Sequence, residues 1–584
     1  MATLPPFEVY GTNVSAPFTL KIFRGEGMVL LGMDWRDGEP PANFVGFAIE
    51  YKEPKGIKFY PLNNRLSFLD NEGNVNPNVL STRLSPIQKF RWVHFPYHPN
   101  LEGDYIYRVV PAYMDTDDKL SYGEYQEAGI AIQGETYPGV LNIAFTRGFV
   151  ASQAFSQRFN KDGRAANILP GDNDDPLTYV SPNALATEAL NWMGFEARKT
   201  ISDILDAAVK DTTAQVRVTA YDLNLPEMVG KLEKLGGRLK IIIDNSVSSP
   251  LKPNDHGAPT SAEAAAEKRL VISAGRANVQ RQRCGNLQHN KTIAVLGNDI
   301  QVAFGGSTNF SWRGFFVQNN NLAVVYGKDQ AGLFFADFDH LFANPDDPAG
   351  FGKTSSASWT DLKLNGVKAS IAFSPHSKSN TCLQGIADSI YRTGSSLLFS
   401  LAFLYQTKGV IQDAIKKITQ TPGSFVYGIS DKSVGGLDVK IPDGNLPIAF
   451  PSALVNNVPQ PYLPETSGGN GIRMHHKFVV IDFDLPSAKV YLGSYNFSIA
   501  ADRNNGENLW LIEDRRVAVA YMIEAVSMFD HYEWRDAVQK AKKSTGGRLF
   551  LKKPPLNAME LPWWKEDYTD KQKAADRILF SKVS

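Results

Sequence analysis

Residues 475–514 read HHKFVVIDFDLPSAKVYLGSYNFSIAADRNNGENLWLIED, and residues 289–327 read HNKTIAVLGNDIQVAFGGSTNFSWRGFFVQNNNLAVVYG. Both stretches begin with a histidine and a lysine two positions apart, and both continue to the pattern Gly-Ser-x-Asn. In a β-strand, side chains two positions apart point to the same face. Each stretch therefore presents an imidazole, an ammonium, a hydroxyl and a carboxamide toward one region.

The two copies differ at their acidic positions. In the second copy an aspartate follows the lysine and a glutamate follows the asparagine, whereas the first copy has Leu296 and Asn320 at these places. The candidate catalytic residues are His289, Lys291, His475, Lys477 and Glu507. The candidate substrate-binding residues are Ser307, Asn309, Asn320, Asp482, Ser494 and Asn496.

The surroundings of the two copies repeat as well. IAFT at 143–146 recurs as IAFS at 371–374, and strand-like segments alternate with helical ones from about residue 139 onward. Such alternation predicts an α/β fold whose mixed, mainly parallel sheets are flanked by helices. We expect two pseudo-symmetric lobes, 139–350 and 351–584, the second including a C-terminal tail. The first half carries a polar, turn-rich insertion (159–183), which is either a lid over a site or an ordinary surface loop.

Residues 1–138 have a different pattern, rich in aromatic and β-branched residues between turn signals. They predict an all-β sandwich with strands near 18–23, 28–35, 44–51, 91–97 and 104–113. The order of Trp35, Tyr51 and YIYRVVPAY (105–113) resembles a fibronectin type III domain. We expect Trp35, Tyr51, Tyr105 and Tyr107 to pack in a core and the module to serve in positioning or adhesion.

The paired histidine–lysine stretches resemble the HKD motifs of the phospholipase D superfamily, and two copies in one chain resemble its two-lobed arrangement. The resemblance covers about 139–584. It implies a phosphoric diester hydrolase that works in two steps through a phosphohistidine. Two lysines and two asparagines would hold the phosphate oxygens, so the resemblance implies no metal and no other cofactor.

The unequal copies suggest roles for the two histidines. If Glu507 lies beside His475, its carboxylate favours an imidazolium that can act as general acid. Asn320 beside His289 would then leave a neutral ring as nucleophile, the role that the N-terminal-motif histidine commonly takes in the family. A decayed first site, in a protein that only binds phosphate, is the alternative to catalysis.

The substrate is less defined than the chemistry. The segment 439–473, before the second motif, is long and rich in proline and apolar residues, which suits acyl chains or an interface. We therefore expect hydrolysis of phospholipid head-group esters with peripheral membrane contact, with a metal-independent endonuclease acting on nucleic acid as the alternative. Arg276, Arg281 and Arg283 form a local basic cluster that could bind a head group, a nucleic acid phosphate or nothing.

Composition sets outer limits on the protein. Its 584 residues fit two to four domains, and its 61 basic and 61 acidic residues give no overall attraction to nucleic acid or anionic membranes. The two cysteines are too few for a cysteine-based zinc site, although one disulfide is conceivable. The N-terminus lacks a secretory signal pattern and no apolar run is long enough for a membrane span, so we expect a cytoplasmic protein unless a non-classical route exports it. Trp563 and Trp564 either touch a membrane or, as we prefer, fasten the tail to its domain.

Overall fold

The computed structural model describes residues 4–582 except 71, 77–78, 149–154, 156–157, 160–166, 172–173, 183–184, 254, 379–380, 431–447, 450–473 and 545–548. Much of the insertion 159–183 and nearly all of the segment 439–473 therefore lie outside the described residues. The chain divides into two compact units. One, the β-rich unit, contains 1–134 and 519–584; the other, the α/β unit, contains 135–439 and 448–518.

The β-rich unit has two antiparallel sheets, one in the order β1-β2-β3-β6 and one in the order β5-β4-β7-β8, with β9 paired to β7. The strands are β1 (Glu8–Tyr10), β2 (Phe18–Arg24), β3 (Val29–Trp35), β4 (Phe44–Lys52), β5 (Tyr60–Pro61), β6 (Arg91–His94), β7 (Asp104–Met114), β8 (Leu120–Tyr122) and β9 (Gln126–Ala131). The predicted all-β region and its five main strands are confirmed. The fibronectin type III resemblance stays a prediction.

Aromatic side chains fill the core between these sheets. Tyr105 and Tyr107 are fully buried, while Trp35 and Tyr51 are half-buried and pack against the same core. The C-terminal residues belong to this unit and not to the second lobe, where the sequence placed them. Trp563 explains why: its ring stacks on Phe90, and its Nε1 donates a hydrogen bond of 3.0 Å to the carbonyl of Phe44. The preferred interpretation of the tryptophan pair as a fastening is thus confirmed.

Three helices complete the β-rich unit: the later part of α11 (Arg515–Ser544), α12 (Glu566–Thr569) and α13 (Lys571–Ser581). No described helix of the chain is both long enough and apolar enough to cross a membrane.

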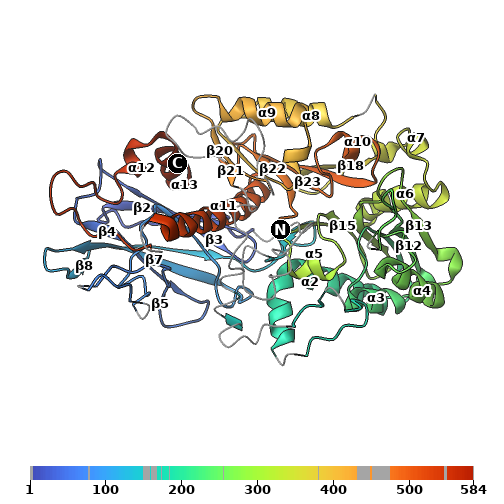
Figure 1. Cartoon of the computed structure of the whole chain (residues 1–584), viewed down its shortest axis with the longest axis horizontal. Coiled ribbons are helices and arrows are strands. Elements are labelled where there is room, and N and C mark those ends of the chain that lie inside the picture. The colour runs from blue at the N-terminus through green and yellow to red at the C-terminus, as the bar shows by residue number, and fades with distance from the viewer. Residues whose placement is uncertain are drawn as a thin grey trace. The chain divides into compact units, whose positions relative to one another are not determined.

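The first lobe of the α/β unit has a seven-stranded sheet in the order β10-β16-β15-β14-β11-β12-β13. Its strands are β10 (Leu141–Phe145), β11 (Gln215–Ala220), β12 (Leu239–Asp244), β13 (Val279–Gln282), β14 (Lys291–Leu296), β15 (Gln301–Gly306) and β16 (Asn321–Tyr326). Its helices are α2 (Ala186–Lys210), α3 (Pro226–Glu233), α4 (Ala262–Ala274), α5 (Trp312–Phe316), α6 (Lys328–Ala343) and α7 (Pro348–Phe351) (Figure 1).

The second lobe repeats this plan with an eight-stranded sheet in the order β17-β18-β24-β23-β22-β19-β20-β21. Its strands are β17 (Thr360–Asp361), β18 (Lys368–Ser374), β19 (Ser396–Leu401), β20 (Phe425–Ile429), β21 (Ile448–Ala449), β22 (Lys477–Ile481), β23 (Lys489–Gly493) and β24 (Glu507–Glu513). Its helices are α8 (Leu383–Tyr391), α9 (Val410–Thr419) and α10 (Ile499–Arg503). Helices α8 and α9 contact each other and lie side by side over this sheet (Figure 1).

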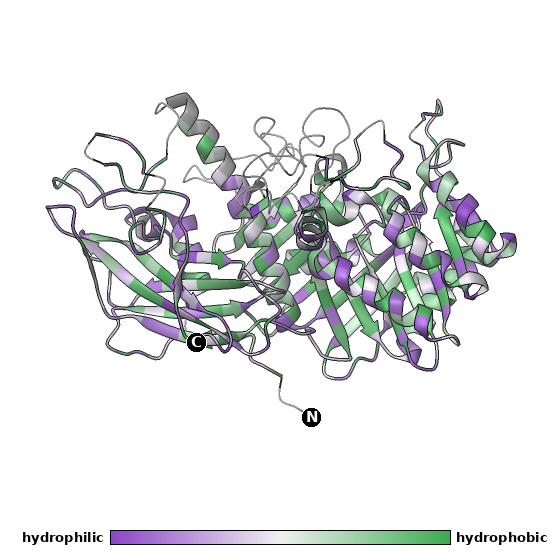
Figure 2. Ribbon diagram, turned by 90° about the horizontal axis from the view of Figure 1, so that it is seen from below, coloured by the Kyte–Doolittle hydropathy of each residue, from purple (hydrophilic) through white to green (hydrophobic). Residues whose placement is uncertain are grey.

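Local sequence accounts for these elements. In α9 the buried residues Ile411, Ala414, Ile415 and Ile418 recur at three- and four-residue spacing, so one face of the helix is apolar and covers the sheet. The strands of both lobes are mainly hydrophobic, whereas the helices carry hydrophilic residues on their other faces (Figure 2). The sheets are thus covered by helices, as an α/β fold requires.

One feature of the predicted sheets is wrong. The sheets are mixed, but the described strands are parallel only at β11–β12, β12–β13, β19–β20 and β20–β21. The other described pairs are antiparallel. They include the motif strands, since β14, β15 and β16 pair in succession as antiparallel neighbours, and β22, β23 and β24 do the same. Cys284 and Cys382 are both buried and free.

Candidate active site

Two short parallel bridges join the lobes inside the α/β unit. Gln288 pairs with Gly506, and Asn319 pairs with Met474. Each bridge lies one residue before two of the predicted site residues. The first bridge thereby brings His289 next to Glu507, and the second brings His475 next to Asn320.

The imidazoles of His289 and His475 lie close together between the two bridges. Their ring centroids are 6.4 Å apart and the ring planes make an angle of 66°. Nδ1 of His289 donates to Glu507 Oε2 at 2.7 Å, and Nδ1 of His475 donates to Asn320 Oδ1 at 2.8 Å. Because each Nδ1 is used in this way, each ring keeps its Nε2 for chemistry.

This pairing reverses the sequence-based expectation. Glu507 was expected beside His475 and Asn320 beside His289, but each partner comes from the other lobe. The serines complete the exchange: Ser494 Oγ donates to Glu507 Oε2 at 2.7 Å, and Ser307 Oγ donates to Asn320 Oδ1 at 2.9 Å. These serines therefore orient the partners of the histidines, which differs from the substrate-binding role predicted for them.

A glycine precedes each of these serines for a steric reason. Gly306 and Gly493 have φ angles of 153° and 143°, in the region that other residues rarely adopt. A Cβ added at Gly306 would lie 2.4 Å from the carbonyl oxygen of Asn321, and one at Gly493 would lie 2.1 Å from that of Asn508. The close approach lets Ser307 and Ser494 accept the N–H of Asn321 and Asn508 at 3.0 Å.

The two lysines bring positive charge into a buried place. The ammonium of Lys477 donates to the carbonyl of His475 at 2.7 Å, and that of Lys291 donates to the carbonyl of His289. Neither forms an ion pair with a described residue. Burial lowers the pKa of Lys291 to about 8, and burial together with Lys291 holds the pKa of Lys477 well below its usual value.

The lysine charges also act on the histidines. Burial lowers the pKa of His289, an effect that the Glu507 carboxylate opposes and Lys291 reinforces. Burial and Lys477 hold the pKa of His475 well below its ordinary value, with no carboxylate to oppose them. Two buried lysines beside the histidines suit an anion, whose binding would favour the charged forms of the lysines.

Asn309 and Asn496 lie two positions after Ser307 and Ser494 in the chain. The carboxamide oxygen of each is buried without a hydrogen-bond partner among the described residues. Such unsatisfied amides are costly unless a ligand engages them. The structure thus brings His289, Lys291, His475 and Lys477 together, with Ser307, Asn320, Ser494 and Glu507 as their supports.

Asp482 does not join this group. The substrate-binding role predicted for it is therefore corrected. It follows the far end of β22, whereas His475 precedes the near end. Its carboxylate accepts the backbone N–H groups of Gly394, Ser395 and Ser396 at 3.0, 2.8 and 3.2 Å. Asp482 therefore fastens the turn before β19.

The sequence analysis did not assign a role to Tyr221. The ring of Tyr221 contacts His289 with centroids 4.6 Å apart, and the Lys291 ammonium lies 4.6 Å above the same ring. Phe403 lies under Lys477 in the same way, at 5.8 Å. Tyr221 follows β11 and Phe403 follows β19, the strands that pair with the motif strands β14 and β22. An aromatic residue at the same place in both lobes could have indicated this role from the sequence.

A group of acidic residues with His256 lies behind Tyr221. His256 bonds Asp244 at 2.8 Å and Asp222 at 3.1 Å, and Asp222, His256 and Glu263 are close enough to share a metal ion. Burial alone would lower the pKa of His256, but the carboxylates raise it to about 11. A protonated imidazole offers no lone pair, so the group is better described as a structural ion cluster.

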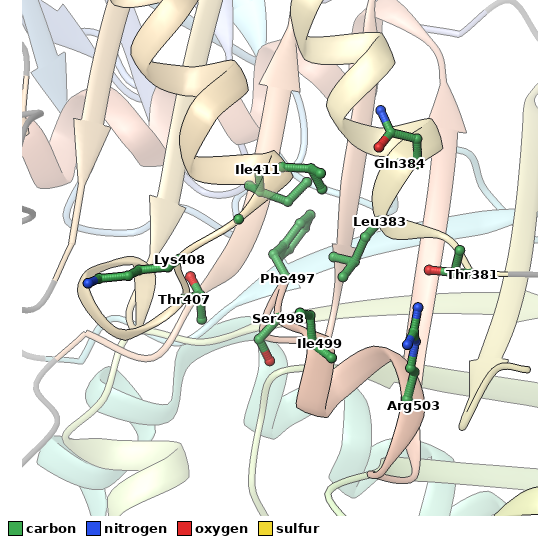
Figure 3. A pocket seen from close by; sticks show the side chains of 12 residues that line it. Thr381, Leu383, Gln384, Thr407, Lys408, Ile411, Phe497, Ser498, Ile499 and Arg503 are labelled. Carbon is green, nitrogen blue, oxygen red and sulfur yellow. The ribbon is translucent and has the colours of Figure 1, made fainter. Parts of the chain in front are cut away.

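An apolar cavity of about 220 Å³ lies in the second lobe, next to the Gly-Ser-x-Asn turn. Its apolar lining consists of Leu383, Val410, Ile411, Phe497 and Ile499. Of these, Leu383, Ile411, Phe497 and Ile499 converge from three segments in Figure 3. Lys408 and Arg503 lie on opposite sides of this apolar group. Phe497 directly follows Asn496, which connects the cavity to the site along the chain.

The two segments that carry the motifs are similar to a known protein family. The family model "Cardiolipin synthase, PLD-like domain" matches residues 205–342 and 449–529, the segments that hold both motifs. These two segments of the chain match a phospholipase D-like domain. Two-part matching of this domain supports the superfamily inferred from the motifs, and with it an enzyme of phosphodiester transfer or hydrolysis.

Other proteins resemble the phospholipase D-like domain over limited lengths. A phospholipase D of Rickettsia prowazekii is 46% identical over 48 residues, which are 8% of this chain and 22% of that protein. The chain thus spans about a fifth of the length of that curated relative. The crystal structure of phosphatidylserine synthase from Haemophilus influenzae aligns with 61% of this chain and 92% of that one, at 13% identity and a TM-score of 0.41. Nuc from Salmonella typhimurium, a phospholipase D family member, aligns with 29% of this chain and 95% of that one, at 18% identity and a TM-score of 0.18.

Proposed function

We propose that the protein hydrolyses the head-group ester of phospholipids by the two-step chemistry of a phospholipase D. The observation that carries the proposal is the opposition of His289 and His475, with Lys291 and Lys477 beside them. Reacting atoms approach to about 3 to 3.5 Å before a bond forms. Two rings with centroids 6.4 Å apart can therefore contact opposite sides of one phosphorus atom.

His289 is the proposed nucleophile, although for a different reason than the sequence suggested. Its Nε2 attacks phosphorus, an N–P bond forms, and the P–O bond to the head group breaks. The resulting phosphohistidine carries positive charge on its ring, and the Glu507 carboxylate that accepts its Nδ1–H stabilises this charge. Among the described residues, no carboxylate stands beside His475 in this way.

His475 is the proposed acid and base. It gives the proton on Nε2 to the departing head-group oxygen, then takes a proton from water as the water oxygen bonds to phosphorus and the N–P bond breaks. The products are phosphatidate and the free head-group alcohol. Because the empty site disfavours protonated His475, the bound phosphate anion must raise its pKa for the first step.

The apolar cavity beside Asn496 favours a lipid over a nucleic acid. Acyl chains or a glycerol backbone would remove its aliphatic and aromatic lining from water, whereas nucleic acid sites usually combine basic grooves with stacking aromatic side chains. Its two flanking cations, Lys408 and Arg503, suit the phosphate-rich surface of a lipid aggregate.

The test uses two substrates in the presence of EDTA. Mixed phospholipid micelles in one tube and supercoiled plasmid in another are incubated with the wild type, His289→Ala and His475→Ala, with the exposed His98→Ala as control. We expect phosphatidate from the wild type and the control alone. Nicked plasmid without phosphatidate would replace the proposal with an endonuclease, and no product in either tube would leave a phosphate-binding protein.

A further inference from the structure

The three arginines that precede the first motif have different fates in the structure. Arg276 pairs with Glu267 at 2.6 Å, and Arg281 donates to the backbone carbonyls of Asp244 and His256. Arg283 is exposed, and its guanidinium has no hydrogen bond or ion pair with a described residue; only its backbone N–H is used, toward Asp346. One cation of the cluster thus remains available for a ligand.

Arg283 lines a cavity of about 360 Å³ in the first lobe. Ser246, Ser248, Asp255 and Asn286 supply most of its other polar groups, and Tyr221 forms part of its wall. The Asp255 carboxylate accepts the N–H groups of Ser248 and Lys252 and the hydroxyl of Ser248, all within 2.8 Å. The Asp255 oxygens are therefore engaged inside their own loop. Arg283 is the charged residue of this cavity whose hydrogen-bond donors are left for a ligand.

Tyr221 connects this cavity to the candidate active site. One side of its ring is in the cavity wall, while the ring also contacts His289 and the Lys291 ammonium. Leu287, two residues before His289, lines the same cavity. The cavity therefore borders the candidate active site at Tyr221 and Leu287.

We propose that this polar cavity binds the alcohol portion of the diester, and that Arg283 selects alcohols that carry an anionic group such as a carboxylate or a phosphate. The inference rests on the proposed function and deepens it. The two cavities then match the two ester groups of a phospholipid: a polar one in the first lobe for the head group and an apolar one in the second lobe for the diacylglycerol. A planar guanidinium suits carboxylate and phosphate because it can donate two parallel hydrogen bonds.

The main experiment compares head-group release from phosphatidylserine and from phosphatidylcholine in the same detergent micelles. The ratio of kcat/KM for the two lipids is measured for the wild type, Arg283→Gln and Arg276→Gln. Arg276 is the matched control, since it is an exposed arginine on the same segment that is already paired. We expect the ratio to favour phosphatidylserine in the wild type and the control, and to fall by roughly 10- to 100-fold in Arg283→Gln, as for loss of a charge-assisted hydrogen bond. An unchanged ratio in Arg283→Gln would overturn the inference.

A binding measurement separates this inference from the proposed catalysis. If the wild type releases no head group from either lipid, the proposed function fails, and glycerol 3-phosphate binding to His289→Ala is then measured by calorimetry. Weaker binding after adding Arg283→Gln, but not after adding Arg276→Gln, supports an anion site at Arg283. Equal binding in all three proteins refutes it.

Discussion

Glu507 accepts a hydrogen bond of 2.7 Å from Nδ1 of His289, which lies 218 positions earlier in the chain and in the other lobe. Asn320 stands in the same relation to His475. Each lobe thus supplies the partner for the other lobe's imidazole. Neither proposed reactive group can be oriented until the two lobes have docked.

The proposed roles predict where a covalent intermediate forms. With bis(4-nitrophenyl) phosphate, whose leaving group needs no proton, His475→Ala should still form a phosphoryl adduct on His289 but release it slowly. We expect kcat to fall by about 10²- to 10⁴-fold, the usual contribution of a general acid or base. Rapid quenching and peptide mass spectrometry locate the adduct. An adduct on His475 in the His289→Ala variant would exchange the two roles.

Removing the charge of Glu507 should alter both rate and pH dependence. Glu507→Gln keeps the shape of the side chain but removes the charge that stabilises the phosphohistidine, so kcat should fall by roughly 10²-fold. The carboxylate raises the pKa of His289 against the effect of burial. Without it that pKa falls, His289 stays neutral to lower pH, and the acidic limb of kcat/KM against pH moves to lower pH. A limb that stays in place would show that His289 is not the group titrating there.

Asn320→Asp should have an effect of opposite sign on the other histidine. The new carboxylate beside His475 raises its pKa, so the ring holds its proton to higher pH. We expect the alkaline limb of the pH profile to move upward. The new carboxylate also loses the hydrogen bond that Asn320 Nδ2 donates to the carbonyl of Gly314 at 2.8 Å, so thermal unfolding is measured in parallel. An alkaline limb at the wild-type position in a folded variant would contradict the role of His475 as the acid.

Asp482→Asn should affect stability and not chemistry. Its carboxylate accepts three backbone N–H groups in the turn before β19, and a neutral amide would satisfy them less well. We expect the free energy of unfolding to fall by about 1 to 3 kcal/mol while kcat remains unchanged. Denaturant unfolding and steady-state kinetics on the same preparation check both parts. A loss of kcat at full stability would return Asp482 to the site.

Much of the fold could be predicted because local patterns determine it. The strands of the β-rich unit, rich in aromatic and β-branched residues, the amphipathic α9 and the repeated motifs all indicate their structure within a few residues. The direction of the strands could not be predicted as well. Alternating helices suggested parallel sheets, but the hairpins that carry the motifs pair in the antiparallel sense, which depends on contacts beyond the local window.

The place of the C-terminal tail was also hidden. Trp563 and Trp564 indicated that the tail is attached to a domain, but no neighbouring residue in the sequence indicates which surface they contact. Stacking of Trp563 on Phe90, more than four hundred positions away in the chain, decides that surface.

The sequence by itself indicated the chemical groups of the candidate site, because both repeated stretches carry histidine, lysine, serine and asparagine at matching places. Only the tertiary structure decided which carbonyl or carboxylate oxygen meets which imidazole. The bridges Gln288–Gly506 and Asn319–Met474 exchange the partners between lobes. Such pairing depends on how two folded sheets dock, and a linear pattern carries no record of that contact.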